Sequence, residues 1–410
     1  MLDVLADLER WQEEGEEIAL ATVVKTWGSA PRPQGARFAM TRSGRLAGSV
    51  SGGCVEGDLF ERALVVLDSG RPVVLHYGIA DEMAFEVGLS CGGAIEVLLE
   101  PFRLDPAWDA VRQALAQQRP AALAQAIAPP SITGRRLALL EAVSGGHANR
   151  PSTPASAELE NEDSAEGFRL LGGLDPELDR AVAAEARRLL LTGGTQLLPL
   201  PWKGEQAAVF VEAFPPPPRL FIVGATHVAI PLCRMARALG FRVAVIDPRS
   251  VFATRERFPE ADELIQTWPD QVLDEARVDA YSYVVVLTHD PKFDVPALAR
   301  ALRSRARYIG VMGSRGTHER RRRRMREEGL SEEEVSRIRA PIGLDLGARS
   351  PEEMALAILA EITAVRYGRD ARPLSEKRGH IHDRPALGGV GAQLAAPLQR
   401  LAVRAGSAGR

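Results

Sequence analysis

A cysteine preceded by two glycines stands in the segment GSVSGGCVEGDL, residues 48–59. Apolar spacing predicts a helix over about 53–67, so we expect Cys54 in its first turn, directly after Gly52 and Gly53. Unpaired N–H groups and the helix dipole at such a terminus stabilise an anion, either a thiolate or a bound phosphate. The segment therefore predicts that Cys54 is a soft ligand or a reactive thiol, with a small buried cysteine as the alternative.

A second cysteine, Cys91, is followed by Gly92 and Gly93 in GLSCGGAIEV. Two glycine-flanked cysteines in one small domain suggest a shared pocket, although Cys91 could equally be a small buried residue. The loop KTWGSAPRPQGARF, residues 25–38, carries Arg32, Gln34 and Arg37. These groups could hold a phosphate or a pterin-like ring, and a turn with surface arginines is the simpler interpretation.

The second half contains an imperfect dinucleotide-binding motif, FIVGATHVA, after a predicted strand and at the start of a predicted helix. Gly224 fits the first glycine of the motif. Thr226 replaces the second, where a β-branched side chain should obstruct the approach of a pyrophosphate. Asp247, at the end of the next strand, suits a carboxylate that reaches a ribose hydroxyl, with a cap or turn role as the alternative.

Other polar residues follow the later strands of the same half. The carboxyl ends of parallel strands meet at one edge of a sheet, which is the ligand crevice of open α/β folds. The sequence therefore predicts a nucleotide crevice that combines Gly224, Thr226, His227, Asp247, His289, Asp290, Ser314 and Arg315. Helix capping is the more ordinary role for Asp290 and Asp294. The arginine run 320–324 is expected on a solvated helix surface with local ion pairs.

The elements that must position these residues change in kind at four prolines, 215–218. Before this stiff linker, helical and strand patterns predict an α+β domain over 1–214, with a surface insertion at 144–167. After it, short apolar strands alternate with helices, which predicts a Rossmann-like, doubly wound parallel sheet over 219–370. Residues 371–410 are expected to form a loose tail. The predicted fold class is α/β, and no repeat of solenoid length is apparent.

Composition limits the possible functions. A formal net charge of −3 gives no overall basic field with which to bind nucleic acid. The start of the chain is unlike a secretion signal, and no apolar stretch approaches membrane-spanning length, so a cytoplasmic protein is expected. Three scattered cysteines do not resemble a disulfide framework or a zinc site, and Cys233 is expected in the core.

These motifs together resemble the xanthine dehydrogenase accessory factor family, called XdhC/CoxI. The likeness includes ATVVKTWGSAPRPQGARFAM, GSVSGGCVEGDL, GLSCGGAIEVLLEP, FIVGATHVA, VIDPR, YIGVMGSRGTHERRRRRMREEGL and APIGLDLGARSPEEMALAILAEITA. It spans nearly the whole chain except 144–167 and the tail. The usual GxGHVG of the family is GATHVA here, so that His227 is retained while two glycines are lost.

The resemblance implies a binding and delivery protein rather than a turnover enzyme. Such a protein binds molybdenum cofactor, protects it during sulfuration and inserts it into a xanthine dehydrogenase-type hydroxylase. Cys54 would contribute to the cofactor site, with a possible contact to molybdenum, and Cys91 matches the second cysteine block. An apo molybdoenzyme, a cysteine desulfurase and further copies of the chain are the implied partners. An NAD(P)-dependent oxidoreductase and a nucleotide-sensing regulator remain alternatives, both based on the Rossmann-like half.

Overall fold

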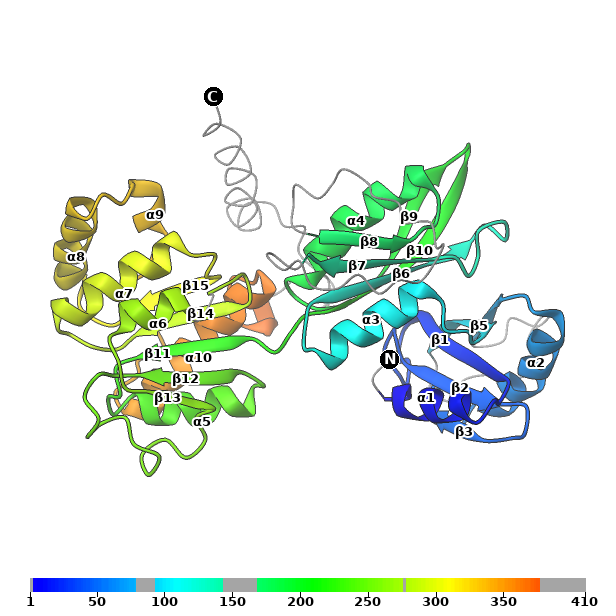
Figure 1. Ribbon diagram of the computed structural model, residues 1–410, viewed down its shortest axis with the longest axis horizontal. Helices are drawn as coiled ribbons and strands as arrows, with labels where there is room; N and C mark the ends of the chain where they lie inside the picture. The colour runs from blue at the N-terminus through cyan, green and yellow to red at the C-terminus, as the bar shows by residue number, and fades with distance from the viewer. Residues whose placement is uncertain (1–2, 79–92, 143–167, 276–277, 377–410) are drawn as a thin grey trace, which may run out of the picture. The chain divides into compact units, whose positions relative to one another are not determined.

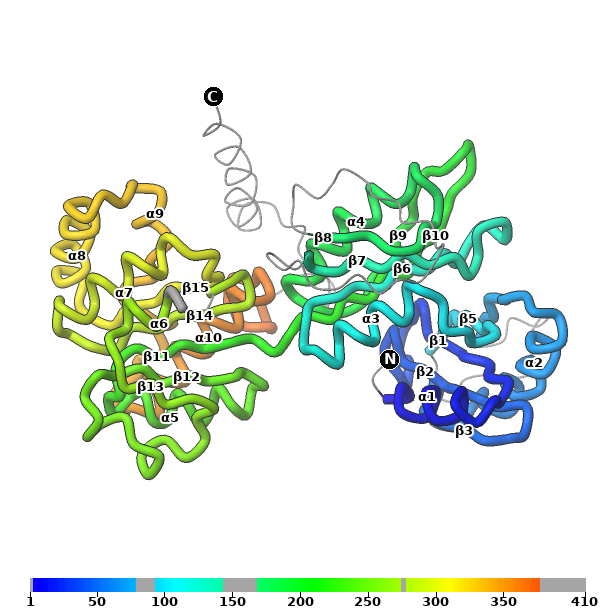
Figure 2. Tube along the Cα trace, viewed as in Figure 1, coloured from blue at the N-terminus to red at the C-terminus, as the bar shows by residue number. Residues whose placement is uncertain are grey.

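The computed structural model describes residues 3–78, 93–142, 168–275 and 278–376 (Figure 1). The chain divides into two compact units, an N-terminal unit, Met1–Phe214, and a C-terminal unit, Pro215–Arg410. It passes from the first unit to the second between Phe214 and Pro215, directly after β10 (Glu205–Phe214) (Figure 2). Among the described residues, no helix is both long and apolar enough to cross a membrane.

The first half of the N-terminal unit is an antiparallel sheet with the strand order β3-β2-β1-β5-β4. Its elements are α1 (Leu5–Glu13), β1 (Ile18–Trp27), β2 (Arg37–Thr41), β3 (Leu46–Gly48), α2 (Glu56–Ser69), β4 (Val73–Tyr77) and β5 (Ala94–Pro101). Helix α2 buries Leu59, Ala63 and Val66 against one face of this sheet. Their helical spacing supplies the apolar stripe that fixes α2 there.

The second half is another antiparallel sheet, with the order β8-β7-β6-β10-β9. Its elements are α3 (Pro106–Ala116), β6 (Ala121–Ala128), β7 (Arg136–Glu141), β8 (Phe168–Gly172), α4 (Pro176–Leu190), β9 (Gly194–Trp202) and β10 (Glu205–Phe214). Helix α4 covers one face. Helices α1 and α3 pack in a shared cluster with strands of both sheets. Of these elements, α3, β6, β8 and β9 were not predicted from the sequence.

The two halves repeat one succession of elements: helix, three strands, helix, two strands. The central strand of each sheet carries a register shift at the same place, between Val23 and Lys25 in β1 and between Ala126 and Ala128 in β6. Among the described residues, the N-terminal unit is therefore an internal structural repeat, which no pattern in the sequence had revealed.

Two glycines mark equivalent points in the halves, where the third strand ends. A methyl group added at Gly48 would lie 2.3 Å from the carbonyl oxygen of Arg37, and one at Gly172 would lie 2.5 Å from that of Arg136. Both glycines also have positive φ, +75° and +80°. Each position therefore excludes a side chain, because a Cβ atom would overlap the neighbouring strand.

Buried ion pairs join the halves reciprocally. Arg37, the first residue of β2, pairs with Glu212 on β10 with an Nη1–Oε1 distance of 3.0 Å. Arg136, the first residue of β7, pairs with Glu100 on β5 with an Nη2–Oε2 distance of 2.7 Å. All four side chains are buried, so the prediction of a surface or ligand-holding arginine was wrong for Arg37. Each half therefore places its arginine against the last strand of the other half, and buried charges need such partners.

The C-terminal unit is a parallel sheet with the order β13-β12-β11-β14-β15-β16. The strands are β11 (Arg219–Val223), β12 (Arg242–Ile246), β13 (Glu263–Ile265), β14 (Ser282–Val286), β15 (Tyr308–Val311) and β16 (Ile338–Arg339). This is the Rossmann strand order, with its switch point between β11 and β14. The predicted α/β fold class, with a Rossmann-like second part, is confirmed.

Helices cover both faces of the parallel sheet. They are α5 (Ala229–Ala238), α6 (Pro269–Glu275), α7 (Pro291–Arg303), α8 (Arg315–Glu327), α9 (Glu332–Ser336) and α10 (Pro351–Tyr367). Helices α5 and α10 pack on one face, and α6 to α9 contribute to the cluster on the other. Ser350 caps α10 in a capping box with Glu353, and Pro351 opens the first turn. Helix α7 begins at Pro291, and Asp290 caps it, which is the ordinary role that the sequence suggested for this residue.

Candidate functional site

Cys54 lies in a glycine-rich loop, residues 49–55, that connects β3 to α2. Helix α2 begins at Glu56 with Val55 as its N-cap, so the prediction that Cys54 stands in the first turn of the helix was wrong. Gly52 and Gly53 have φ values of +77° and +114°, and nothing lies within 4 Å of a Cβ placed at either. Glycine is favoured there by the backbone conformation alone. Both glycines are exposed, and Cys54 beside them is half-buried.

The carboxylate of Glu56 organises this loop. It accepts hydrogen bonds from Ser49 Oγ at 2.7 Å, Ser51 N at 2.9 Å, Gly53 N at 2.9 Å and Val55 N at 3.2 Å. Further bonds come from Val50 N and Ser51 Oγ. Burial acts to raise the pKa of Glu56, but these donors lower it to about 2. Glu56 is therefore a carboxylate at neutral pH and the anion at this helix terminus.

The N–H groups that we expected to stabilise a thiolate or a phosphate are thus largely taken by Glu56. Gly53 and Val55, on either side of Cys54, both donate to it. The role of Glu56 as the acceptor of these hydrogen bonds was not predicted from the sequence. The sequence does contain a sign of this role, because Glu56 follows a Ser- and Gly-rich loop in the first turn of a helix. A carboxylate at that position can accept hydrogen bonds from the N–H groups of the preceding loop.

Two other segments that the sequence singled out reach the same part of the unit. Ala30, in the loop between β1 and β2, and Cys54 both pack against the apolar cluster under α2. Gly93 lies against that loop, because a methyl group added to it would lie 2.7 Å from the carbonyl carbon of Ser29. The loop 28–36 thus contacts the last glycine of the second cysteine motif. Cys91 and Gly92 themselves lie outside the described residues.

Arg32 and Gln34 stand half-buried in the loop 28–36. Arg32 Nη2 is 3.5 Å from Asp3 Oδ2, a long contact between side chains that are each 41% exposed. The Nε atom of Arg32 is buried and has no hydrogen-bond partner among the described residues. A long, partly exposed ion pair contributes little to stability, so the guanidinium can exchange Asp3 for another anion.

The parallel register places the turns after β11, β12, β14 and β15 at one edge of the sheet of the C-terminal unit. Gly224 has a φ of +99°, and a methyl group added to it would lie 2.4 Å from Thr288 Cγ2. Thr226 is half-buried and donates its N–H to the carbonyl of Gly224 at 2.9 Å, while His227 and His289 are exposed. Asp290 caps α7. Ser314 caps α8, whose first residue is Arg315.

Asp247 does not face this crevice with a free carboxylate. Its side chain is fully buried and accepts from the N–H of Ala225 at 2.9 Å and from Arg249 Nη2 at 2.8 Å. Burial acts to raise the pKa of Asp247, but the hydrogen bonds from Arg249 and Ala225 lower it overall. These contacts match the turn role that the sequence left open. To bind Asp247 as in an NAD(P)-dependent enzyme, a ribose hydroxyl would have to displace these hydrogen bonds.

Asp294 and Arg321 form a buried ion pair, although the sequence suggested a helix cap for the first and a solvated surface for the second. Asp294 is 1% exposed and pairs with Arg321 at 2.5 Å, while Thr288 also donates to it. Arg321 further donates to the carbonyl of Met312 at 2.8 Å. The predictions of a cap for Asp294 and of a solvated surface for the whole arginine run were therefore wrong for this pair. Met325, one turn after Arg321, faces the same core, and this helical spacing was the missed signal.

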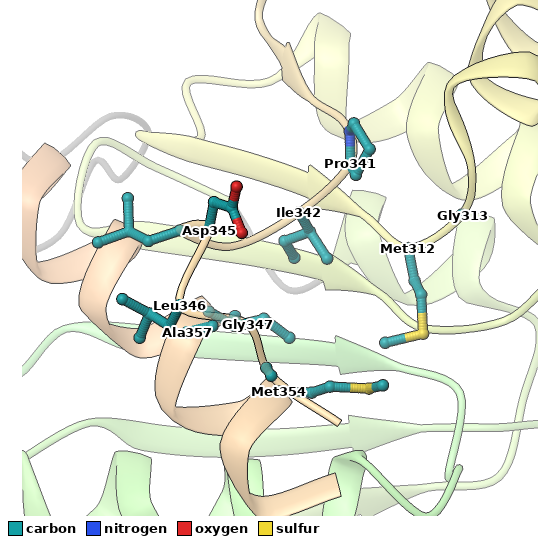
Figure 3. A pocket seen from close by; sticks show the side chains of 12 residues that line it. Met312, Gly313, Pro341, Ile342, Asp345, Leu346, Gly347, Met354 and Ala357 are labelled. Atoms are coloured by element: carbon teal, nitrogen blue, oxygen red, sulfur yellow. The ribbon is translucent and has the colours of Figure 1, made fainter. Parts of the chain in front are cut away.

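A cavity of about 400 Å³ opens near the ends of β15 and β16. Figure 3 shows methionine and aliphatic side chains around it, with Asp345 on the loop that follows β16. Its walls come from the turn after β15, from the loop 341–348 and from the first turns of α10. Among the described residues, no three His, Cys, Asp or Glu side chains gather as a metal site.

Comparisons with known proteins match this architecture. A model of the XdhC Rossmann domain matches residues 220–362, and a model of the XdhC and CoxI family matches residues 11–78. A relative from Bacillus subtilis (strain 168), named as a probable subunit of xanthine dehydrogenase, is 30% identical over 370 residues, covering 89% of this chain and 96% of the relative.

A second relative, from Escherichia coli (strain K12), is named "Molybdenum cofactor insertion chaperone PaoD". It is 27% identical over 356 residues, covering 87% of this chain and 86% of its own length. A solved structure described as a xanthine dehydrogenase from Bacillus halodurans has the same fold, with a TM-score of 0.52 at 24% identity over 91% of this chain and 97% of that one. Because the match to the Bacillus subtilis relative extends over both units, the chain belongs to the XdhC and CoxI family.

Proposed function

We propose that this protein is a molybdenum cofactor insertion chaperone, which holds the cofactor as cargo and delivers it to an apo xanthine dehydrogenase-type hydroxylase. The similarity to a relative named as such a chaperone supports this function for the chain as a whole. The loop 49–55, with half-buried Cys54 next to the exposed Gly52 and Gly53, supports the place of cofactor binding.

The observation that carries the proposal is the difference between the two halves of the N-terminal unit. In the second half, residues 173–175 suffice to connect β8 to α4. In the first half, the equivalent connection is the longer loop 49–55, with two glycines of positive φ, a cysteine and the Glu56 carboxylate that fixes them. The shared fold does not need this elaboration, so a function in binding accounts for it better than a structural role.

The chemistry of the loop suits a metal that accepts a sulfur ligand. A cysteine sulfur binds molybdenum as the thiolate, and the exposed glycine backbone lets a bulky ligand approach it. We further propose that Arg32 and Gln34 contact the anionic and pterin parts of the cofactor, and that Cys91 contributes through the segment that ends at Gly93. Protection of the cofactor during sulfuration, a cysteine desulfurase as donor of sulfur, and self-association belong to the same proposal.

Delivery can be tested with the full-length protein, purified from cells that make the cofactor and mixed with an apo molybdenum hydroxylase. We expect the wild type to restore hydroxylase activity and Cys54→Ala to restore little. Cys233→Ala is the matched control, because Cys233 is fully buried in the core of the other unit. Equal restoration by wild type and Cys54→Ala would contradict the assigned place of binding, and no restoration by any variant would contradict delivery itself.

A further inference from the structure

The loops after β12 and β13 carry a group of exposed apolar side chains. Phe252 is 40% exposed and Trp268 is 43% exposed. Phe252 follows β12, while Trp268 immediately precedes α6. Exposure of large aromatic side chains to water is unfavourable. Their grouping at the carboxyl edge of the parallel sheet therefore points to a binding role.

These rings are joined by a guanidinium and a buried ring into one continuous surface. The guanidinium carbon of Arg249 is 4.5 Å from the ring centre of Phe252 and 5.7 Å from that of Phe293. The rings of Phe293 and Trp268 are 5.0 Å apart at an interplanar angle of 39°. Phe293 is 8% exposed and forms the base, while the other three side chains are open to solvent.

Arg249 is held firmly in this arrangement. Its Nε and Nη2 atoms donate to the two oxygens of Asp247 at 2.9 and 2.8 Å, and its own N–H donates to Asp247 Oδ1 at 3.0 Å. The buried carboxylate therefore fixes the position of the guanidinium instead of binding a ligand itself. A planar cation fixed beside aromatic rings is a stacking surface for another planar ring.

We propose that Arg249, Phe252, Trp268 and Phe293 form a stacking platform for the base of a nucleoside or nucleotide, at the carboxyl edge of the Rossmann sheet. Recognition by ring stacking does not need a ribose contact from Asp247. It also does not need the second glycine that Thr226 replaces. The platform is a second ligand site, separate from the cysteine loop of the N-terminal unit.

The test is calorimetric titration of the full-length protein with ADP, adenosine and inorganic phosphate, on wild type, Trp268→Ala and Phe252→Ala. Trp27→Ala is the matched control, because Trp27 is also 43% exposed but belongs to the other unit. We expect ADP or adenosine to bind and either platform substitution to weaken binding by about tenfold, since each stacked ring contributes to binding of the base. The control should bind as the wild type does.

Three results would overturn the platform: no binding of either ring-bearing probe, binding that neither platform substitution weakens, or phosphate alone competing as well as ADP. Because Arg249 neutralises a buried carboxylate, its removal could unfold the unit, so the test uses only exposed aromatic side chains. Cofactor retention by Trp268→Ala is measured on the same samples. It should equal that of the wild type, which separates failure of the platform from failure of the chaperone proposal.

Discussion

Glu56 lies two residues after Cys54 and accepts hydrogen bonds from the residues on both sides of it, Gly53 N–H at 2.9 Å and Val55 N–H at 3.2 Å. The cysteine is thus presented by a backbone loop whose shape depends on one carboxylate. A preorganised loop binds its ligand with a smaller loss of conformational entropy than a loose one. Glu56 is in this sense a positioning residue for the proposed cofactor site.

Replacing Glu56 by alanine should leave the loop donors without their acceptor. We expect Glu56→Ala to lower the free energy of unfolding by about 1.5–3 kcal/mol, the range for a hydrogen bond to a charged group. Urea unfolding measures this change, with Glu61→Ala as control, since Glu61 is exposed on the same helix. If both variants unfold at the wild-type urea concentration, Glu56 does not hold the loop.

The contribution of Glu56 to stability should depend on pH in the acid range. Its folded-state pKa of about 2 lies below its usual value of 4.5, so its contribution is complete above about pH 4.5 and is lost as the pH falls toward 2. The difference in unfolding free energy between wild type and Glu56→Gln should shrink over this interval. A difference that grows on acidification would have the wrong sign for a depressed pKa.

The pair Arg37–Glu212 should be strongly coupled. Removing one partner leaves a buried charge, so Arg37→Met and Glu212→Gln should each cost about 3–5 kcal/mol of unfolding free energy. The double variant should cost less than the sum of the two. A double-mutant cycle by urea unfolding measures the coupling, and additive costs would show that the two side chains act independently.

Gly224 should tolerate no side chain, for a reason that differs from that of Gly240. Both have positive φ, +99° and +81°, but only Gly224 would bring a methyl group within 2.4 Å of Thr288, whereas nothing lies within 4 Å at Gly240. Gly240→Ala should therefore lose about 1–2 kcal/mol through backbone strain alone, and Gly224→Ala clearly more. Equal losses in thermal unfolding would exclude the clash with Thr288.

The sequence predicted the Rossmann-like part well, because short apolar strands alternating with capped helices allow few topologies. It did not predict the structural repeat in the N-terminal unit. The matched features there are two glycines and two arginine–glutamate pairs far apart in the chain, while the apolar residues around them differ. Strands β6 and β9 were missed because their alanine- and leucine-rich sequences, AALAQAIA and GTQLLPLPW, have weak strand propensity.

At the candidate sites, residue types were predicted better than their contacts. Cys54 was correctly expected near the start of a helix. That the Glu56 carboxylate accepts the hydrogen bonds of the loop N–H groups depends on the three-dimensional path of the loop, which the sequence does not give. Asp247 was recognised by its spacing, yet its ion pair with Arg249, only two residues away, determines whether it can contact a ligand. Asp294 and Arg321 show the same limit, because charged residues that find a buried partner look like surface residues in a sequence.

The chaperone proposal is tested most directly by the molybdenum and pterin that co-purify with the full-length protein from a molybdenum-replete cytoplasm. The variants to compare are wild type, Cys54→Ala and the control Cys233→Ala, whose thiol has a pKa raised to about 11 by burial. We predict that wild type and Cys233→Ala retain both molybdenum and pterin, and that Cys54→Ala loses them while remaining folded. Equal retention by Cys54→Ala and the wild type, or no molybdenum in any of the three, would contradict the account.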